Sequence, residues 1–162
     1  MIVYLVRHAV AMEREDWDKS DDSRPLTEEG IERMREAAGG LARLSIKVDR
    51  VFTSPLTRAR QTADILVKEL RLAKAELLES LAHGYPATLV LKALEDVPAD
   101  CDCMLVGHEP DMGHLAAVFL GAAGPLPFKK GSIMAVDFGG RIGQSRGRML
   151  WYMPTKIARL LK

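Results

Sequence analysis

Short β-branched runs alternate with amphipathic segments along this chain, and that alternation predicts an α/β fold. The length of 162 residues suits one compact domain spanning residues 1–162, and 48% hydrophobic residues can supply its core. Because strands separated by helices run parallel, we expect a three-layer α/β/α sandwich with a mostly parallel central sheet. The last two expected strands follow each other after a short connection, which predicts an antiparallel pair at one edge.

The first elements are a buried strand, a polar loop and a helix. Residues 2–6 (IVYLV) form a β-branched run typical of a strand buried on both faces. Residues 13–23 are too hydrophilic to pack and predict an exposed loop. Thr27 then caps a helix whose apolar residues recur at three- and four-residue steps as far as Leu41.

The middle of the chain is expected to repeat this alternation. A second strand is predicted over residues 48–53, and Ser-Pro then breaks it before a helix over residues 56–70. Residues 76–78 form a short third strand, and residues 88–94 form a helix that a following proline ends.

The C-terminal part is expected to complete the sheet. A strand over residues 103–106 precedes a helix with a clear apolar face over residues 112–120. Alternating patterns over residues 132–138 and 148–153 predict two strands joined by a glycine-rich turn. The basic amphipathic tail from Lys156 is expected to be a solvated final turn.

Charge and cysteine content exclude several classes of function. Lys plus Arg total 23 against 22 Asp plus Glu, so a broad nucleic-acid or membrane footprint is not expected. Cys101 and Cys103 stand too close together for a disulfide framework and predict reduced core thiols. Since the N-terminus lacks a basic leader and no apolar run approaches ~18 residues, we expect a soluble cytoplasmic protein without membrane contacts.

Arginines and histidines follow several of the predicted strands, at the point where each strand ends. Arg7 and His8 follow the first strand, Arg58 opens the helix after the second, and His108 follows the strand over residues 103–106. Ligands of open α/β sheets bind at the carboxyl ends of the strands, so these side chains are expected to converge there. Glu79 and His83 follow the short third strand.

This set of residue types predicts phosphoryl transfer through a phosphorylated histidine. Two arginines can grip a tetrahedral anion bidentately, and helix N-termini add backbone donors. Their positive field keeps a nearby imidazole neutral and therefore nucleophilic. The arginines would neutralise the charge on the equatorial oxygens during in-line transfer. No phosphate loop of the nucleotide hydrolases and no zinc-ligand spacing is present.

Four blocks in order resemble the histidine phosphatase superfamily, the phosphoglycerate-mutase-like enzymes. The blocks are Leu-Val-Arg-His-Ala over residues 5–9, Arg-Pro-Leu-Thr-x-x-Gly over 24–30, Ser-Pro-x-x-Arg-Ala-x-Gln-Thr over 54–62 and Val-Gly-His-Glu-Pro over 106–110. Their order and spacing, together with the short chain, look most like the SixA-type phosphohistidine phosphatases.

The resemblance implies a site and a reaction. It implies that His8 is the phosphorylated nucleophile, that Arg7, Arg58 and His108 form the phosphate pocket, and that Arg24 adds a contact. It also implies a phosphoglycerate-mutase-like fold and a metal-independent phosphatase without a cofactor. The implied substrate is a phosphohistidine, on a phosphorylated protein rather than on a small molecule, and phosphate is the product.

The chain departs from the family at two points. Residue 9 is Ala where the family has Gly, which is tolerable if the backbone there avoids positive φ. The acidic proton donor of larger members has no clear counterpart, although Glu79 and His83 lie in the right region. A missing acid favours phosphohistidine, because imidazole leaves with less help from a proton donor than an alkoxide does. A small-molecule phosphomonoesterase and a non-catalytic module that binds phosphorylated ligands are the alternatives.

Several of these residues also have a structural interpretation. Arg24 can equally be a surface ion pair of its loop, and His83 is more simply a solvated loop histidine than an acid or a substrate contact. Trp17 is either a lid over the pocket or a partner contact. Ser54 is expected to cap the helix that follows it, Glu109 to support the first turn of its helix by charge, and His114 to lie on a polar helix face.

Overall fold

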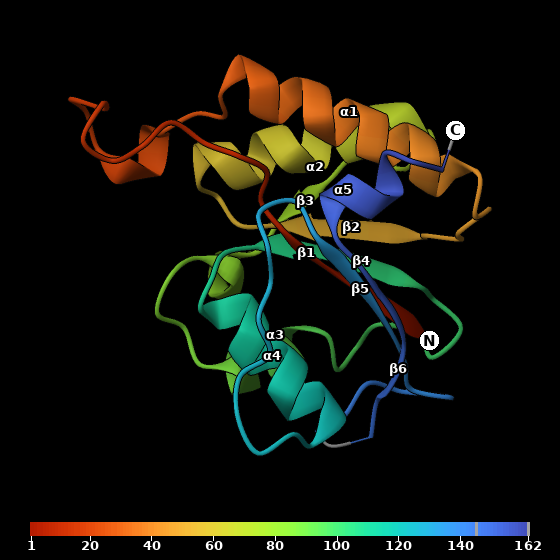
Figure 1. Cartoon of the computed structure of the whole chain (residues 1–162). Helices are drawn as coiled ribbons and strands as arrows, with labels where there is room; N and C mark the ends of the chain where they lie inside the picture. The colour runs from red at the N-terminus through yellow and green to blue at the C-terminus, as the bar shows by residue number, and fades with distance from the viewer. Residues whose placement is uncertain (145, 162) are drawn as a thin grey trace.

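The computed structural model describes residues 1–144 and 146–161, which build a six-stranded sheet with helices on both faces (Figure 1). In chain order the elements are β1 (Ile2–Arg7), η1 (Asp21–Ser23), α1 (Glu28–Ala42), β2 (Arg50–Thr53), α2 (Thr57–Leu70), β3 (Glu76–Leu77), η2 (Glu79–Leu81), α3 (Ala87–Ala93), β4 (Cys103–Gly107), α4 (Asp111–Leu120), β5 (Ile133–Asp137), β6 (Arg148–Met153) and α5 (Thr155–Ala158).

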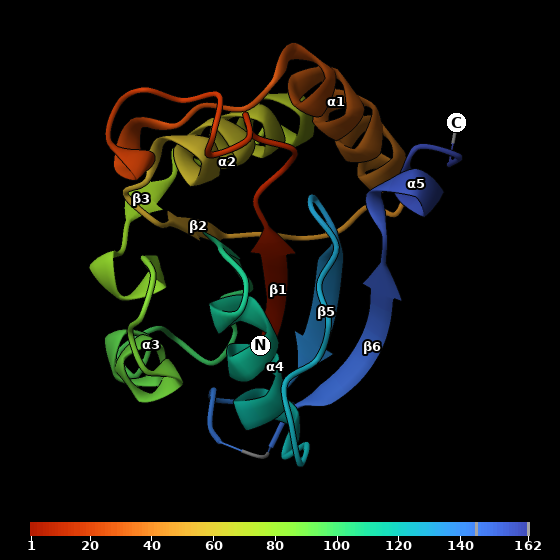
Figure 2. The same cartoon turned by 60° about the vertical axis from the view of Figure 1, so that its left-hand side comes forward.

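The strand order is β3-β2-β4-β1-β5-β6. The first four of these strands are parallel, β5 pairs antiparallel with β1, and β6 pairs antiparallel with β5. The helices α1, α2 and α5 cover one face and α3 and α4 the other (Figure 2). The predicted α/β/α sandwich with a mostly parallel sheet and an antiparallel edge pair is confirmed.

The two faces of the sheet carry separate apolar cores, which explains why β1 is apolar throughout. Val3 and Leu5 belong to the core beneath α3 and α4. Tyr4 and Val6 point to the opposite face and pack in the core beneath α1 and α2. Successive side chains of a strand point to opposite faces, so a strand covered by helices on both sides needs an unbroken apolar run.

Local signals set the ends of several elements. The Thr27 hydroxyl accepts the N–H of Gly30 at 3.0 Å, so the predicted cap of α1 is confirmed. The second strand begins at Arg50 rather than at Val48. Asp49 instead accepts the N–H of Asp102 on its carboxylate at 2.8 Å, a side-chain contact outside the strand ladder.

The C-terminal tail differs from its prediction. Instead of a solvated turn, α5 packs on α1, and Ala158 is only 2% exposed. Gly40 makes this close approach possible, since a Cβ there would lie 1.9 Å from the Ala158 carbonyl oxygen. Arg159 forms an ion pair with Glu36 of α1. The packing of such a short amphipathic segment cannot be predicted from the sequence, because it depends on a glycine of another helix that leaves room for it.

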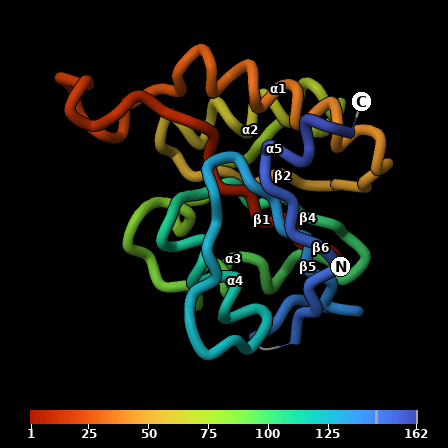
Figure 3. The backbone as a smooth tube through the Cα atoms, viewed as in Figure 1, coloured from red at the N-terminus to blue at the C-terminus, as the bar shows by residue number. Residues whose placement is uncertain are grey.

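The polar segment over residues 13–23 leaves the body of the molecule and returns through η1 (Figure 3). Most of it is exposed, as predicted. The Trp17 indole N–H donates to the Ser20 carbonyl at 3.0 Å, so this side chain is held within its own loop.

Two further expectations concern thiols and membranes. Both cysteines are free; Cys103 is buried, whereas Cys101 is only partly buried rather than a core residue. Among the helices that the structure describes, none has the length and apolar character needed to cross a bilayer.

Candidate active site

The carboxyl ends of β1, β2 and β4 lie side by side, because these neighbouring strands are parallel and in register. Arg7 pairs with Gly107 at the last positions of β1 and β4, so the next residues, His8 and His108, emerge together. Their ring centroids are 5.1 Å apart, and the His83 ring lies 4.2 Å from that of His108. The convergence predicted from the strand ends is present.

His8 is held as a neutral imidazole. Its side chain is almost fully buried, and Nδ1 lies 2.7 Å from the Ala9 carbonyl oxygen. Since a carbonyl can only accept, Nδ1 carries the proton and Nε2 keeps a free lone pair. Burial lowers the pKa of His8 to about 3; the bond to Ala9 opposes this shift, and the charges of Arg58, Arg7 and Arg24 add to it.

Ala9 stands where the resemblance expects glycine, and the backbone tolerates it. Ala9 is buried and does not adopt a left-handed conformation, so its methyl group brings no backbone strain. Its N–H donates to the Thr62 hydroxyl at 3.0 Å, and that hydroxyl donates to the Arg58 carbonyl at 2.7 Å. Thr62 thus links the segment after His8 to the first turns of α2.

Arg7 is positioned by the loop before β5. Its Nη1 donates to the Phe128 carbonyl at 2.6 Å, while Nε is buried and has no hydrogen-bond partner in the part of the chain described. Glu109 organises that loop by accepting the N–H groups of Phe128 at 2.7 Å and Gly113 at 3.0 Å. Glu109 therefore supports the start of α4 by hydrogen bonding as well as by charge. Burial lowers the pKa of Arg7, and Glu109 opposes the shift.

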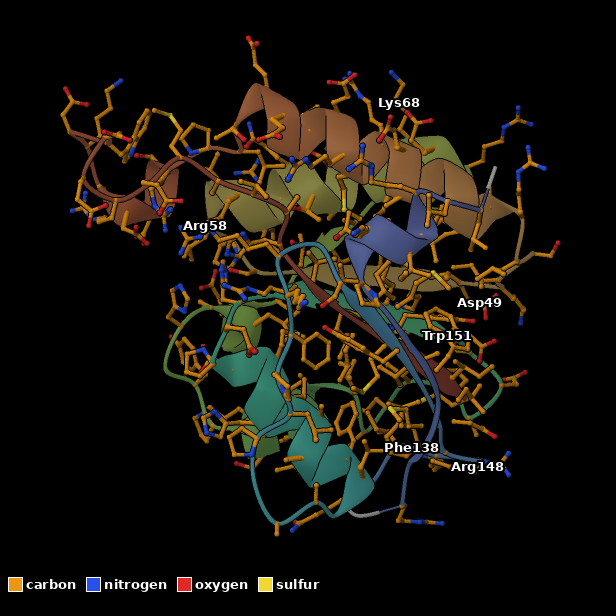
Figure 4. The ribbon with its side chains drawn as sticks, in the orientation of Figure 1. Asp49, Arg58, Lys68, Phe138, Arg148 and Trp151 are labelled. Carbon is orange, nitrogen blue, oxygen red and sulfur yellow. The ribbon has the colours of Figure 1, made fainter. Side chains whose placement is uncertain are left out.

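Arg58 occupies the first turn of α2 with its side chain only 1% exposed. Nη2 lies 3.0 Å from a carboxylate oxygen of Asp21, and Nη1 donates to the Asp21 carbonyl at 2.8 Å. The Nε of Arg58 is buried without a partner among the described residues. Burial lowers the pKa of Arg58, and Asp21 opposes the shift. Figure 4 shows Arg58 at the start of α2, beside the returning polar loop.

His108 is fully buried, and its Nε2 lies 2.8 Å from the hydroxyl oxygen of Ser54. Burial lowers its pKa to about 2, and the neighbouring His8, His83, Arg58 and Arg24 add to the shift. Ser54 is not the helix cap predicted from sequence: Leu56 occupies that position, and α2 starts without a side-chain cap. Because α2 begins two residues later than a Ser54 cap would place it, the Ser54 hydroxyl accepts the N–H of Leu56 at 3.2 Å and also contacts His108.

The two peripheral candidates, Arg24 and His83, both lie at the site. Arg24 donates to a carboxylate oxygen of Asp21 at 2.8 Å and to the Met12 carbonyl, so it links the two ends of the polar loop. His83 is 43% exposed, yet its Nε2 is 2.7 Å from Arg58 Nη2. His83 is thus an exposed loop residue, as expected, and its ring also contacts Arg58 and His108. Glu79 is exposed at the start of η2, and His114 is exposed on α4, as expected for the latter.

Asp21, Thr62 and Asp111 contribute to the site but were not identified from the sequence. Asp111 accepts from His83 Nδ1, with 3.3 Å between the atoms, which makes Nε2 of that ring the acceptor for Arg58. The pKa of Asp21 is below its usual value; burial opposes the shift, and the Arg24 hydrogen bond and the Arg58 charge cause it. The one available signal was the position of Asp21 three residues before Arg24, on the same short turn. Among the residues described, no group of three or more His, Cys, Asp or Glu side chains is placed to hold a metal ion.

Comparisons with known proteins agree with this arrangement. A model of the histidine phosphatase superfamily (branch 1) matches residues 3–84. An uncharacterized protein of Picosynechococcus is 36% identical over 143 residues, covering 86% of each chain. The phosphohistidine phosphatase SixA of Escherichia coli is 30% identical over 140 residues, covering 84% of each chain.

Solved structures agree as well. The histidine phosphatase SixA complexed with tungstate superposes with a TM-score of 0.85 at 27% identity, covering 96% of this chain and 98% of that one. A putative SixA from Agrobacterium tumefaciens, with a TM-score of 0.78 at 23% identity and coverage of 94% and 97%, supports the fold alone. On the family match and on the relatives aligned over most of its length, this chain belongs to branch 1 of the histidine phosphatase superfamily.

Proposed function

We propose that this protein is a phosphohistidine phosphatase that works through a covalent phospho-His8 intermediate. The observation that carries the proposal is the placement of the buried Arg58, the partly buried Arg7 and two neutral imidazoles at one edge of the sheet. Arg7 and Arg58 each keep a buried Nε–H without a partner among the described residues, so donors remain for phosphate oxygens.

In the first step, Nε2 of His8 attacks phosphorus. The new P–N bond to His8 forms as the P–N bond to the substrate imidazole breaks, and the leaving imidazole departs neutral because it carries a proton on its other nitrogen. Arg7, Arg58 and His108 hold the three equatorial oxygens and offset their charge. The Nδ1–H of His8 stays on the Ala9 carbonyl, which stabilises the phosphorylated ring.

In the second step, water attacks the phosphorus of phospho-His8. The P–O bond forms as the P–N bond breaks, inorganic phosphate takes the oxygen of water, and His8 returns as a neutral imidazole. The low pKa of His8, about 3, means that it stays unprotonated and nucleophilic at physiological pH.

Two considerations support phosphohistidine as the substrate. An imidazole protonated on its distal nitrogen leaves without a strong proton donor, and Glu79, the carboxyl group directly after β3, is exposed to solvent. The likeness to the phosphohistidine phosphatase SixA of Escherichia coli, at 30% identity, points in the same direction.

The experiment is to trap the intermediate and compare substrates. A phosphohistidine peptide should be hydrolysed far faster than a phosphoserine peptide or a sugar phosphate, and rapid quenching should yield acid-labile phosphate on His8. His8→Ala should abolish turnover, whereas His114→Ala, which removes an exposed histidine of α4, should retain it. Unchanged kcat in His8→Ala, with the protein folded, would refute the mechanism.

A small-molecule phosphomonoesterase is the second candidate, and the His83–Asp111 pair favours it. A histidine at the rim with Nδ1 on a carboxylate can donate a proton to an alkoxide once its Nε2 is protonated and leaves Arg58. In that case sugar phosphates should be the better substrates, and His83→Ala should remove one limb of the pH–rate profile.

A further inference from the structure

A pocket of about 270 Å³ lies beside the proposed active site and carries only positive charge. The charged side chains in its lining are Arg33, Lys130, Lys156 and Arg159, with no carboxylate among the lining residues. Its floor is apolar and includes Met34 of α1. A site with a basic rim and an apolar floor suits an anionic chain that also carries methylene groups.

The pocket opens at the same edge of the sheet as the catalytic histidines. Figure 2 shows β1 and β6 pointing to this edge, with α5 following β6 and the loop before β5 beside them. Ala9, the residue after His8, contributes to the lining. The N–H of Gly131, also in the lining, donates to the carbonyls of Arg7 at 3.2 Å and His8 at 3.0 Å. Thus His8, His108 and Arg58 lie on the β4 side of β1, and the basic pocket lies on its β5 side.

The basic surface continues beyond this pocket. A second hollow of about 340 Å³ shares Lys130 and Lys156 with the first and adds Lys129 and the exposed Ile157. We call the surface formed by both hollows the lysine groove. The lysine groove extends from Ala9, the residue after His8, to Ile157 of α5. A single phosphate group is too small to contact this whole surface.

The charges of the lysine groove are available to a ligand. Lys130 pairs with Glu13 at 3.3 Å, but Glu13 is well exposed and Lys130 partly so, and an incoming carboxylate can therefore replace Glu13 at little cost in free energy. Within the described part of the chain, Lys129 and Lys156 form no ion pair. Arg33 and Arg159 pair with Glu29 and Glu36, whose carboxylates are not part of the lining.

We propose that the lysine groove binds an acidic segment of a phosphoprotein substrate while the phosphorylated side chain occupies the His8 site. The inference rests on the proposed phosphatase function and names the substrate class: a protein whose phosphohistidine is flanked by Asp or Glu residues. Charge complementarity along an extended surface favours association with such a segment and excludes basic ones.

The test compares two phosphohistidine peptides that differ only in flanking residues, glutamates in one and serines in the other. The wild type should show a kcat/KM about tenfold higher for the glutamate peptide, and added salt should reduce that preference. The double charge reversal Lys130→Glu with Lys156→Glu should remove the preference through KM, while kcat on phosphoramidate stays unchanged. The control is Lys74→Glu with Lys92→Glu, which makes the same change in net charge at two exposed lysines outside the groove. This variant should keep the preference for the glutamate peptide.

A binding measurement separates this inference from the proposed reaction. Fluorescence anisotropy of labelled hexaglutamate should give a Kd about tenfold weaker for the Lys130/Lys156 variant than for wild type or the control. If hexaglutamate binding depends on Lys130 and Lys156 while neither peptide is hydrolysed, the lysine groove is confirmed as an anion-binding surface. The proposed phosphohistidine phosphatase activity is then refuted. Equal preference in variant and wild type refutes the lysine groove. The proposal is also refuted if pyrophosphate binding depends on the two lysines and hexaglutamate does not bind. The pocket would then be a site for a small anion.

Discussion

The buried guanidinium of Arg58 already holds a carboxylate, that of Asp21, at 3.0 Å. In the proposed mechanism a phosphoryl group binds the same guanidinium, so we expect Asp21 and the substrate to compete for it. Asp21→Asn should therefore lower the inhibition constant of inorganic phosphate about fivefold, the effect of removing one partly exposed ion-pair partner. The Asp21 carbonyl, which accepts from Nη1 at 2.8 Å, remains in the variant.

The matched control for this substitution is Asp22→Asn, which removes the adjacent, exposed carboxylate. Phosphate inhibition of that variant should differ little from wild type when hydrolysis of phosphoramidate is followed. Weaker phosphate binding in Asp21→Asn would mean that the carboxylate aligns Arg58 for the substrate instead of competing with it.

The same residues predict that catalysis does not depend on a metal ion. In the proposed mechanism, Arg7 and Arg58 supply the positive charge that a divalent cation would otherwise provide to phosphoryl oxygens. Turnover of a phosphohistidine peptide should therefore persist after dialysis against EDTA, measured as phosphate release. A loss of activity that zinc or magnesium restores would contradict the proposed mechanism.

At the scale of single residues, the side chains that follow strands could be predicted from the sequence to lie together, but the contacts between loops could not. His8 and His108 could be placed together because a parallel sheet brings their strand ends to one edge. The bond between Asp21 and Arg58 spans 37 residues, and that between Ser54 and His108 spans 54. Such contacts depend on how loops fold back and on rotamers, neither of which has a periodic signal in the sequence.

Among the elements, the contact between α1 and α5 gives a sharp test. Two consecutive glycines near the end of α1 differ in surroundings: a Cβ at Gly40 would collide with the Ala158 carbonyl, and one at Gly39 would meet nothing within 4 Å. Gly40→Ala should destabilise the protein by ~1–3 kcal/mol through overpacking. Gly39→Ala should instead stabilise it by about 0.5–1 kcal/mol, since alanine favours the helix.

Urea unfolding measures both variants under identical conditions. Opposite signs of the change in unfolding free energy are expected for the two substitutions, although both replace a helical glycine with alanine. If Gly40→Ala is as stable as Gly39→Ala, α5 does not pack on α1 as closely as described.

Long periodic elements could be predicted well, and short ones could not. The apolar stripes of α1 and α2 extend over several turns, so helix type and burial followed from the pattern. The helix α5 has four residues, too few for a stripe, and its burial depends on Gly40. The start of β2 also shifted, because Asp49 bonds Asp102 through both its backbone N–H and its carboxylate, and the pairing with β4 begins only at Arg50.

For the whole molecule, one arrangement determines both reactivity and acid stability. The sheet buries His8 and His108 between helical layers, and burial is the largest cause of their low pKa values, about 3 and about 2. The two uncharged rings, the proposed nucleophile and the proposed phosphate ligand, therefore lower the stability of the fold wherever the unfolded chain can protonate them.

The sign of the resulting pH dependence is fixed. An unfolded histidine titrates near 6.5, so between pH 6.5 and about 3 the unfolded state binds protons that the folded state does not. The stability contributed by each neutral ring is complete above pH 6.5 and declines as the pH falls. From pH 7 to pH 5 the expected loss is about 2 kcal/mol for each of the two histidines.

Urea unfolding at pH 7 and pH 5 checks this in wild type, His8→Asn and His114→Asn. Asparagine does not titrate, so His8→Asn should remove about half of the pH-dependent loss, roughly 2 kcal/mol. His114 is exposed, so its replacement should leave the loss unchanged. A His8→Asn protein with the same pH dependence as wild type would show that His8 is protonated in the folded state near pH 5. The ring would then lack a free lone pair at Nε2 there, and the low pKa could no longer explain its nucleophilicity.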